Sequence, residues 1–163
     1  MKTSRLLSLI LLCFLVAHTQ TLSAKSHCNS IDKVARQIAD DWKDGYNTGN
    51  ADKVAALYTE DAYYLTQHFV SGIVKGRANI RAYVQLGVEA KYHVDTIQIL
   101  STDCSGDMAY SVDRYESTNG GQKAFGVNIV VIKKIGDDWR IVAHEAAVPD
   151  PATAIQQLQP LSH

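Results

Sequence analysis

Apolar residues in the first part of the chain recur at the spacing of an α-helix. Between Ile31 and Tyr46 they fall three or four positions apart, which places them on one face of a helix. Ser30 precedes this run as a candidate N-cap, and Gly49 follows it as a candidate stop. The pattern therefore predicts an amphipathic helix with one buried face. Its apolar positions are Ile31, Val34, Ala35, Ile38, Trp42 and Tyr46.

Two shorter helices and a strand are predicted to follow. The second helix opens at Asn50 and ends at residues 59–61, and the third ends near Gly87. Between these two helices, residues 62–68 are aromatic and β-branched, which favours a strand.

From Tyr92 onward the apolar positions alternate with polar ones, as they do in strands. The joining segments contain turn-forming pairs, namely Ser105-Gly106, Asn119-Gly120 and Gly136-Asp137. Helices followed by a run of hairpin-linked strands predict an α+β domain with an antiparallel sheet. The predicted strands cover residues 92–100, 108–117, 122–135 and 139–148.

The turn pairs also predict which residues share a face of the sheet. With two-residue loops at Asn119-Gly120 and at Gly136-Asp137, Asp113 lies opposite Gly126 and Asn128 lies opposite Glu145. This register gathers polar side chains on the inner face, where a ligand would have room beside the glycine. They are Ser111, Asp113, Asn128 and Glu145.

The opposite face of the predicted sheet is apolar as well. A sheet with one solvated face normally alternates between apolar and polar residues, and the helices are expected to cover only the inner face. We therefore expect a homodimer that packs through this outer face. The residues in question are Val112, Val127, Ile129, Val131 and Val142.

The orientation of His144 depends on the regularity of the last strand. A regular strand places Trp139 and Glu145 on the inner face and His144 on the outer face. A β-bulge would reverse this and bring His144 into the pocket beside Trp139. The sequence leaves both orientations of His144 open. In the regular strand, Glu145 is the carboxylate that faces the cavity.

The first 24 residues have the features of a secretory signal peptide. Lys2 and Arg5 precede an apolar run, residues 6–16, that is too short to span a bilayer, and Ala24 ends the segment. Residues 25–163 are then one domain with a C-terminal tail at 150–163. We expect a secreted or periplasmic protein that leaves the membrane once the signal is cleaved.

Two cysteines remain after this cleavage, Cys28 and Cys104. In an oxidising compartment such a pair predicts one disulfide, and two free thiols are the alternative.

The six histidines are scattered and no His or Cys pair has ligand spacing, so no metal site is predicted. No phosphate-binding glycine loop or dinucleotide motif is found, so no cofactor is predicted. With 16 basic against 17 acidic residues and no basic stripe, nucleic acid is not an expected partner.

Several motifs together resemble the nuclear transport factor 2-like superfamily, and within it the SnoaL-like domains. They are Trp42 and Tyr46 in the first helix, Gly49-Asn50, residues 57–62, residues 76–80, and the final hairpin at 136–142. The resemblance implies a cone-shaped, curved antiparallel sheet with N-terminal helices packed on its concave face, a ligand cavity and frequent dimerisation. Its members include ketosteroid isomerase, polyketide cyclases, dehydratases and non-catalytic binding or assembly modules, so the fold leaves the activity open.

The ketosteroid isomerase pattern is not met. That enzyme needs a carboxylate base and two hydrogen-bond donors, a tyrosine and a protonated aspartate. In an ungapped alignment the tyrosine position falls on Trp42, the base on Thr66 and the aspartic acid on Val130. Steroid isomerisation by that mechanism is therefore not expected.

The candidate catalytic residues are His68, Asp113 and Glu145, because an imidazole or a carboxylate in an apolar cavity can carry protons near neutral pH. A surface histidine and solvated carboxylates at the mouth of the cone are the alternatives. Asn128 is a candidate donor to a substrate carbonyl. The candidate ligand-binding residues are Trp42, Tyr46, Tyr64, Thr66, Ser111, Tyr115, Asn128 and His144.

Two functions are consistent with these observations. The first is binding of a small, largely apolar molecule with a cofactor-free proton transfer of the isomerase, cyclase or dehydratase type. The second is a non-catalytic ligand-binding or homo-oligomerisation module.

Overall fold

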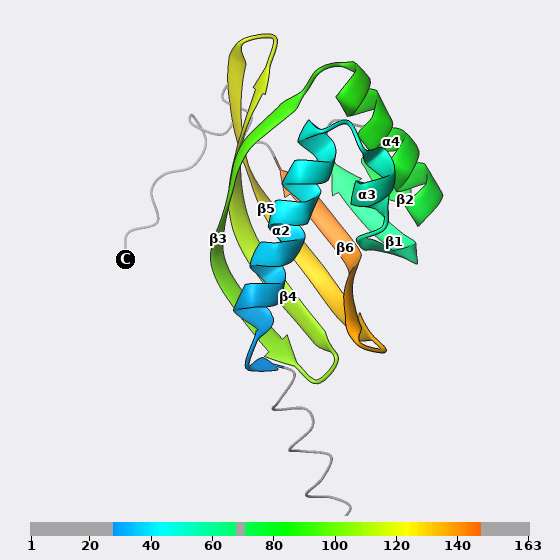
Figure 1. The fold of residues 1–163 in the computed structure, drawn as a ribbon, viewed down its shortest axis with the longest axis vertical. Coiled ribbons are helices and arrows are strands. Elements are labelled where there is room, and N and C mark those ends of the chain that lie inside the picture. The colour runs from blue at the N-terminus through cyan, green and yellow to red at the C-terminus, as the bar shows by residue number, and fades with distance from the viewer. Residues whose placement is uncertain (1–27, 68–70, 148–163) are drawn as a thin grey trace, which may run out of the picture.

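The computed structural model describes residues 28–67 and 71–147 (Figure 1). The predicted signal peptide, His68 and the predicted tail at 150–163 lie outside the described residues. The elements are α2 (Ile31–Asn47), α3 (Ala51–Ala55), β1 (Tyr58–Thr66), β2 (Ile73–Lys75), α4 (Arg77–Glu89), β3 (His93–Ser105), β4 (Met108–Asn119), β5 (Gln122–Ile135) and β6 (Asp138–Ala147).

The strands form a six-stranded curved sheet in the order β2-β1-β6-β5-β4-β3. Helix α2 crosses its concave face, and α3 and α4 lie beside α2, over the end of the sheet that β1 and β2 form (Figure 1). The predicted α+β class with helices on the concave face is confirmed. One pairing departs from an all-antiparallel sheet, because β1 runs parallel to β6.

The amphipathic helix that the apolar spacing predicts is present as α2. Ile31, Ala35 and Tyr46 are buried on the face that meets the sheet. The side chain of Ser30 makes no capping hydrogen bond. Asn50, by contrast, caps α3, because its side-chain oxygen accepts a hydrogen bond from the backbone N–H of Lys53 at 2.9 Å.

The third helix, α4, ends at Glu89, two residues beyond Gly87, near which its end was predicted. A Cβ at Gly87 would lie 1.7 Å from the hydroxyl oxygen of Tyr46, so the glycine allows α4 to approach α2. The predicted end of the second helix at 59–61 is wrong, because these residues belong to β1. Strand β2 was not predicted.

The hairpin between β4 and β5 turns one residue later than predicted. Gly120 and Gly121 form the loop, so Asp113 pairs with Asn128, and Gly126 pairs with Tyr115. The pairing moved by two residues along β5. An even shift preserves the face of every side chain, so the predicted faces of β4 and β5 hold.

A β-bulge in β6 reverses the predicted faces in the second half of that strand. The register begins as predicted, with Ile132 opposite Ile141, but Val131 then pairs with Ala143, so Val142 is an extra residue. Beyond it, His144 is buried on the inner face and Glu145 is exposed on the outer face. The prediction that Glu145 faces the pocket is therefore wrong.

The predicted disulfide between Cys28 and Cys104 is present, with a Cα–Cα distance of 5.5 Å. It links the segment before α2 to the end of β3 across 76 residues of sequence. It thereby fixes the first turn of α2 to the sheet that the helix covers.

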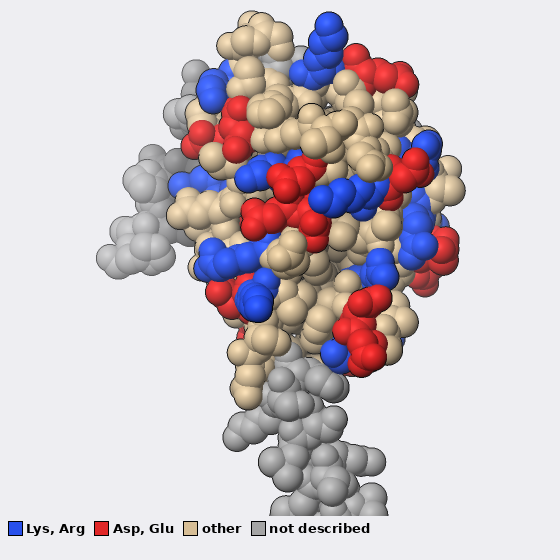
Figure 2. Space-filling model, in the orientation of Figure 1, with Lys and Arg blue, Asp and Glu red and all other residues tan. Residues whose placement is uncertain are grey.

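Charged side chains of both signs are intermingled over the face of the molecule that carries α2 (Figure 2). Within the described residues, no helix is long and apolar enough to cross a membrane.

Candidate functional site

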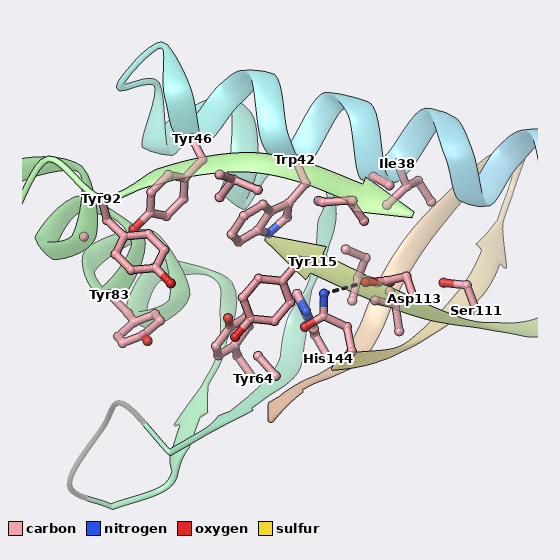
Figure 3. A pocket seen from close by; sticks show the side chains of 18 of the residues that line it. Ile38, Trp42, Tyr46, Tyr64, Tyr83, Tyr92, Ser111, Asp113, Tyr115 and His144 are labelled. Carbon is pink, nitrogen blue, oxygen red and sulfur yellow. Dashed lines mark hydrogen bonds between the residues drawn. The ribbon is translucent and has the colours of Figure 1, made fainter. Parts of the chain in front are cut away.

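A cavity of about 350 Å³ lies between the concave face of the sheet and the helices α2 and α4 (Figure 3). Most of its lining is apolar or aromatic, and the polar groups come from β4, β5 and β6. None of the lining residues is Lys or Arg. The residues that line it are Ala35, Ile38, Ala39, Trp42, Tyr46, Tyr64, Tyr83, Leu86, Gly87, Ala90, Tyr92, Val94, Ile97, Ser111, Asp113, Tyr115, Asn128, Val130, Ile132, Ile141, His144 and Ala146.

Asp113 supplies the carboxyl group of this cavity. Its side chain is only 2% exposed, and one oxygen accepts a hydrogen bond of 2.6 Å from the side-chain N–H of Asn128. Burial raises the pKa of Asp113 to about 6, and the hydrogen bond from Asn128 opposes part of this rise. Asp113 can therefore gain and lose a proton close to neutral pH.

His144 is the second buried titratable group of the cavity. Its Nδ1 lies 2.7 Å from the hydroxyl of Tyr58, which accepts a hydrogen bond of 3.0 Å from the indole N–H of Trp42. Burial lowers the pKa of His144 to about 3, so the imidazole is neutral at physiological pH. Its Nε2 is buried and has no hydrogen-bond partner among the described residues.

Aromatic rings form the wall around these groups. Trp42 stacks on Tyr46 with ring centroids 5.1 Å apart, and Tyr64 meets the ring of His144 edge-on at 4.6 Å. Burial raises the pKa of Tyr115 to about 12, so its phenol stays protonated and can donate a hydrogen bond. Figure 3 shows Tyr115 between the aromatic wall and Asp113.

Eight predicted site residues line the cavity, and the structure places them together. Three other predictions fall elsewhere: Thr66 is buried on β1 outside the cavity, Glu145 faces outward because of the bulge, and His68 lies outside the described residues. A hydrogen bond between Thr66 and Tyr83 lowers the pKa of Tyr83 against the larger effect of burial. The eight residues are Trp42, Tyr46, Tyr64, Ser111, Asp113, Tyr115, Asn128 and His144.

Sequence reasoning missed the hydrogen bond between Tyr58 and His144, and the contributions of Tyr83 and Tyr92 to the cavity wall. The apolar spacing assigned Tyr58 to a helix, whereas it begins β1 directly beside Ile141 of β6. Only the parallel pairing of β1 with β6 brings its hydroxyl to His144, and local sequence does not signal that pairing. Within the described ranges, no three His, Cys, Asp or Glu side chains are grouped so as to hold a metal ion.

The model of the SnoaL-like domain family matches residues 39–144, a range that holds all of the lining residues except Ala35, Ile38 and Ala146. The chain belongs to the SnoaL-like domain family. No curated protein matches it.

Solved structures of other proteins share the fold of this SnoaL-like domain. A nuclear transport factor 2-like protein from Novosphingobium aromaticivorans is 19% identical, with a TM-score of 0.61 over 86% of this chain and 91% of that one. A ketosteroid isomerase-like protein from Erwinia carotovora is 18% identical, with a TM-score of 0.63 over 73% of this chain and 96% of that one. A nuclear transport factor 2-like protein of unknown function from Pseudomonas putida is 15% identical, with a TM-score of 0.64 over 83% of this chain and 98% of that one. At these identities the similarity establishes the cone-like fold alone.

Proposed function

We propose that this SnoaL-like domain binds a small, largely apolar molecule in its cavity and catalyses a cofactor-free proton transfer, of the isomerase, cyclase or dehydratase type. The observation that carries the proposal is Asp113, a carboxyl group buried among apolar side chains with a pKa of about 6. A general acid or base works best when its pKa lies near the working pH. Burial of an ionisable group lowers the stability of the fold, and such groups are concentrated at functional sites. The buried carboxyl group of Asp113 therefore favours a functional role.

In this proposal the ionised Asp113 removes a proton from the ligand, and its protonated form returns the proton to a second position. Asn128 orients the carboxyl group through the hydrogen bond of 2.6 Å. Trp42 and the tyrosines exclude water and bind the apolar part of the ligand. Glu145 has no role in the reaction, because the bulge turns it away from the cavity.

The proposal predicts that the protein accelerates the exchange of carbon-bound hydrogen for deuterium in an enolisable aryl ketone such as 2-tetralone. Asp113→Asn should lower the rate on the order of a hundredfold or more, because the amide cannot accept the proton. The wild-type rate should rise with pH through about 6 and then level off, because only the ionised carboxylate acts as a base. Nuclear magnetic resonance of the ketone in heavy water measures both effects.

The exposed turn variant Asp137→Asn serves as a control and should exchange at the wild-type rate. Equal rates for the wild type and Asp113→Asn would remove Asp113 from the mechanism.

A second function, homo-oligomerisation, is favoured by the outer face of the sheet. Val127 and Ile129 of β5 are 44% and 47% exposed, and Val112, Val131 and Val142 beside them are half-buried. An apolar face of this kind is typical of an interface. We propose a homodimer through this face, which leaves the cavity on the opposite face free.

We also propose that the protein is exported to a secreted or periplasmic location. The disulfide between Cys28 and Cys104 supports this location, because disulfides persist in oxidising compartments. Mass measurement of the mature chain from its native compartment checks the proposal, since cleavage after Ala24 gives a defined N-terminus.

A further inference from the structure

Two residues that line the cavity each carry a buried polar atom without a hydrogen-bond partner among the described residues, Nε2 of His144 and Oδ1 of Asn128. The two residues are only 5% and 7% exposed. Buried polar atoms without partners are uncommon and cost free energy, so a ligand that pairs with both would regain it.

The two atoms belong to neighbouring strands on the same face of the sheet. Asn128 of β5 pairs with Ala146 of β6, and Val130 pairs with His144, so Asn128 and His144 are diagonal neighbours. Both residues line the cavity. The two atoms themselves are covered by neighbouring side chains, so a ligand oxygen reaches them only when these side chains move. The amide N–H of Asn128 is used by Asp113, which leaves its carbonyl oxygen as an acceptor.

The hydrogen bonds behind His144 determine which of its nitrogens carries the proton. The indole of Trp42 can only donate, so it occupies the hydroxyl oxygen of Tyr58 as an acceptor. If Tyr58 donates its proton to Nδ1, the one group of these three side chains left without a partner among the described residues is the N–H at Nε2. If Nδ1 were the donor, both the proton of the fully buried Tyr58 and the lone pair of Nε2 would lack a partner in these bonds. The first arrangement leaves fewer buried groups unpaired.

We infer that Trp42 and Tyr58 hold His144 in the tautomer protonated at Nε2, so that His144 and Asn128 form a donor–acceptor pair that binds a hydroxyl group of the ligand. The inference deepens the proposed ligand binding and rests on it. Tyr58 is a positioning residue here, because it acts through His144 and does not line the cavity.

The chemistry of the pair selects among oxygen groups. A hydroxyl accepts from Nε2–H and donates to the carbonyl oxygen of Asn128, so it satisfies both atoms. A ketone or ether oxygen accepts only, and leaves Asn128 unpaired. A carboxylate also accepts only, and it would meet the negative charge of Asp113. With aromatic rings as the cavity wall, an aryl or polycyclic alcohol or a phenol fits best.

Nitrogen-15 spectroscopy of histidine-labelled wild-type protein tests the tautomer without any ligand or turnover. We expect a protonated Nε2 and an unprotonated, hydrogen-bonded Nδ1 for His144 at neutral pH, assigned by comparison with His144→Gln. Tyr58→Phe should move the Nδ1 resonance, since it removes the hydrogen bond. A proton on Nδ1, on both nitrogens, or an unmoved resonance in Tyr58→Phe would overturn the inference.

A matched series of ligands tests the hydroxyl site by calorimetry, with 2-naphthol, 2-methoxynaphthalene and 2-methylnaphthalene as probes. We expect 2-naphthol to bind about tenfold more tightly than the methyl compound, with the methoxy compound between them. His144→Gln, which keeps an N–H near the position of Nε2, should preserve this order, whereas His144→Asn should not. Equal affinities for the three probes, or no measurable binding of 2-naphthol, would overturn the hydroxyl site.

These experiments separate the inference from the proposed catalysis. They measure protonation and binding only, so a protein that fails to exchange deuterium but passes both tests would retain the hydroxyl site and lose the proton-transfer function.

Discussion

Asp113 and His144 show how burial dominates the charge state of the cavity. Burial disfavours the ionised form of each, so it raises the pKa of the carboxyl group to about 6 and lowers that of the imidazole to about 3. At neutral pH the cavity therefore holds one carboxylate and one neutral histidine. Two titratable groups whose pKa values move apart can take different roles, here an acid/base and a neutral hydrogen-bond donor.

The raised pKa of Asp113 predicts how the stability of the protein depends on pH. The folded chain binds the proton more tightly than the unfolded chain, so stability falls as pH rises from about 4 through 6. A rise from 3.8 to about 6 corresponds to a penalty of about 3 kcal/mol once the group is ionised.

We therefore expect Asp113→Asn to match the wild type near pH 4 and to exceed its free energy of unfolding by up to about 3 kcal/mol above pH 7, because the amide keeps the acceptor for Asn128 and carries no charge. Urea unfolding across this pH range measures the difference. Asp137→Asn, in the exposed final turn, is the matched control and should stay within about 0.5 kcal/mol of the wild type. A constant difference between Asp113→Asn and the wild type at every pH would contradict the prediction.

At the scale of the elements, the bulge in β6 decides which residues form the site. Periodicity predicted α2 and the strands from β3 onward, because long apolar patterns report directly on a buried face. The same alternation is compatible with either Glu145 or His144 inside the cone. The bulge involves the pairing of three strands. β6 shifts register against β5, and the pairing of β1 with β6 also shifts, between Tyr58 and Tyr63. Such long-range pairing has no local signature in the sequence.

The cost of burying two carboxylates favours His144 over Glu145 on the inner face of β6. Two carboxylates in one apolar cavity are costly, because each must be desolvated and they repel each other when both are ionised. The bulge leaves Asp113 as the cavity carboxylate and replaces Glu145 with a neutral imidazole.

The contact between β4 and β5 at Gly126 predicts a variant that closes the cavity. A Cβ at this position would lie 2.3 Å from ring carbons of Tyr115, which is the residue directly opposite in the pairing. Gly126→Ala should therefore displace the ring of Tyr115, weaken the binding of 2-naphthol and cost about 1–3 kcal/mol of stability. Calorimetry and thermal unfolding measure the two effects.

Tyr115→Leu in the Gly126→Ala background is the matching control. It removes the ring that clashes and should recover most of the lost stability. If Gly126→Ala alone bound 2-naphthol as the wild type does, the close contact between the glycine and the ring would not shape the cavity.

At the scale of the whole molecule, one face of the sheet holds the cavity, and the other carries the exposed apolar residues Val127 and Ile129 through which we propose a dimer. We expect sedimentation to show a dimer at micromolar concentration. The double variant Val127→Lys with Ile129→Lys should be monomeric, because it places charges on the apolar outer face, and it should still bind 2-naphthol. Ile73→Lys, which changes an exposed apolar residue of β2, should remain dimeric. A wild-type protein that sediments as a monomer would contradict the interface.

The helices, the sheet and the bulge together place one carboxyl group in an apolar cavity, and the account depends on the state of that group. Titration of the Asp113 carboxyl by carbon-13 magnetic resonance tests this most directly, with Asp113→Asn to assign the signal. We predict a midpoint near pH 6, where the carboxyl group can exchange a proton with a bound ligand. A midpoint near 3.8, the value of a solvated aspartate, would contradict the account.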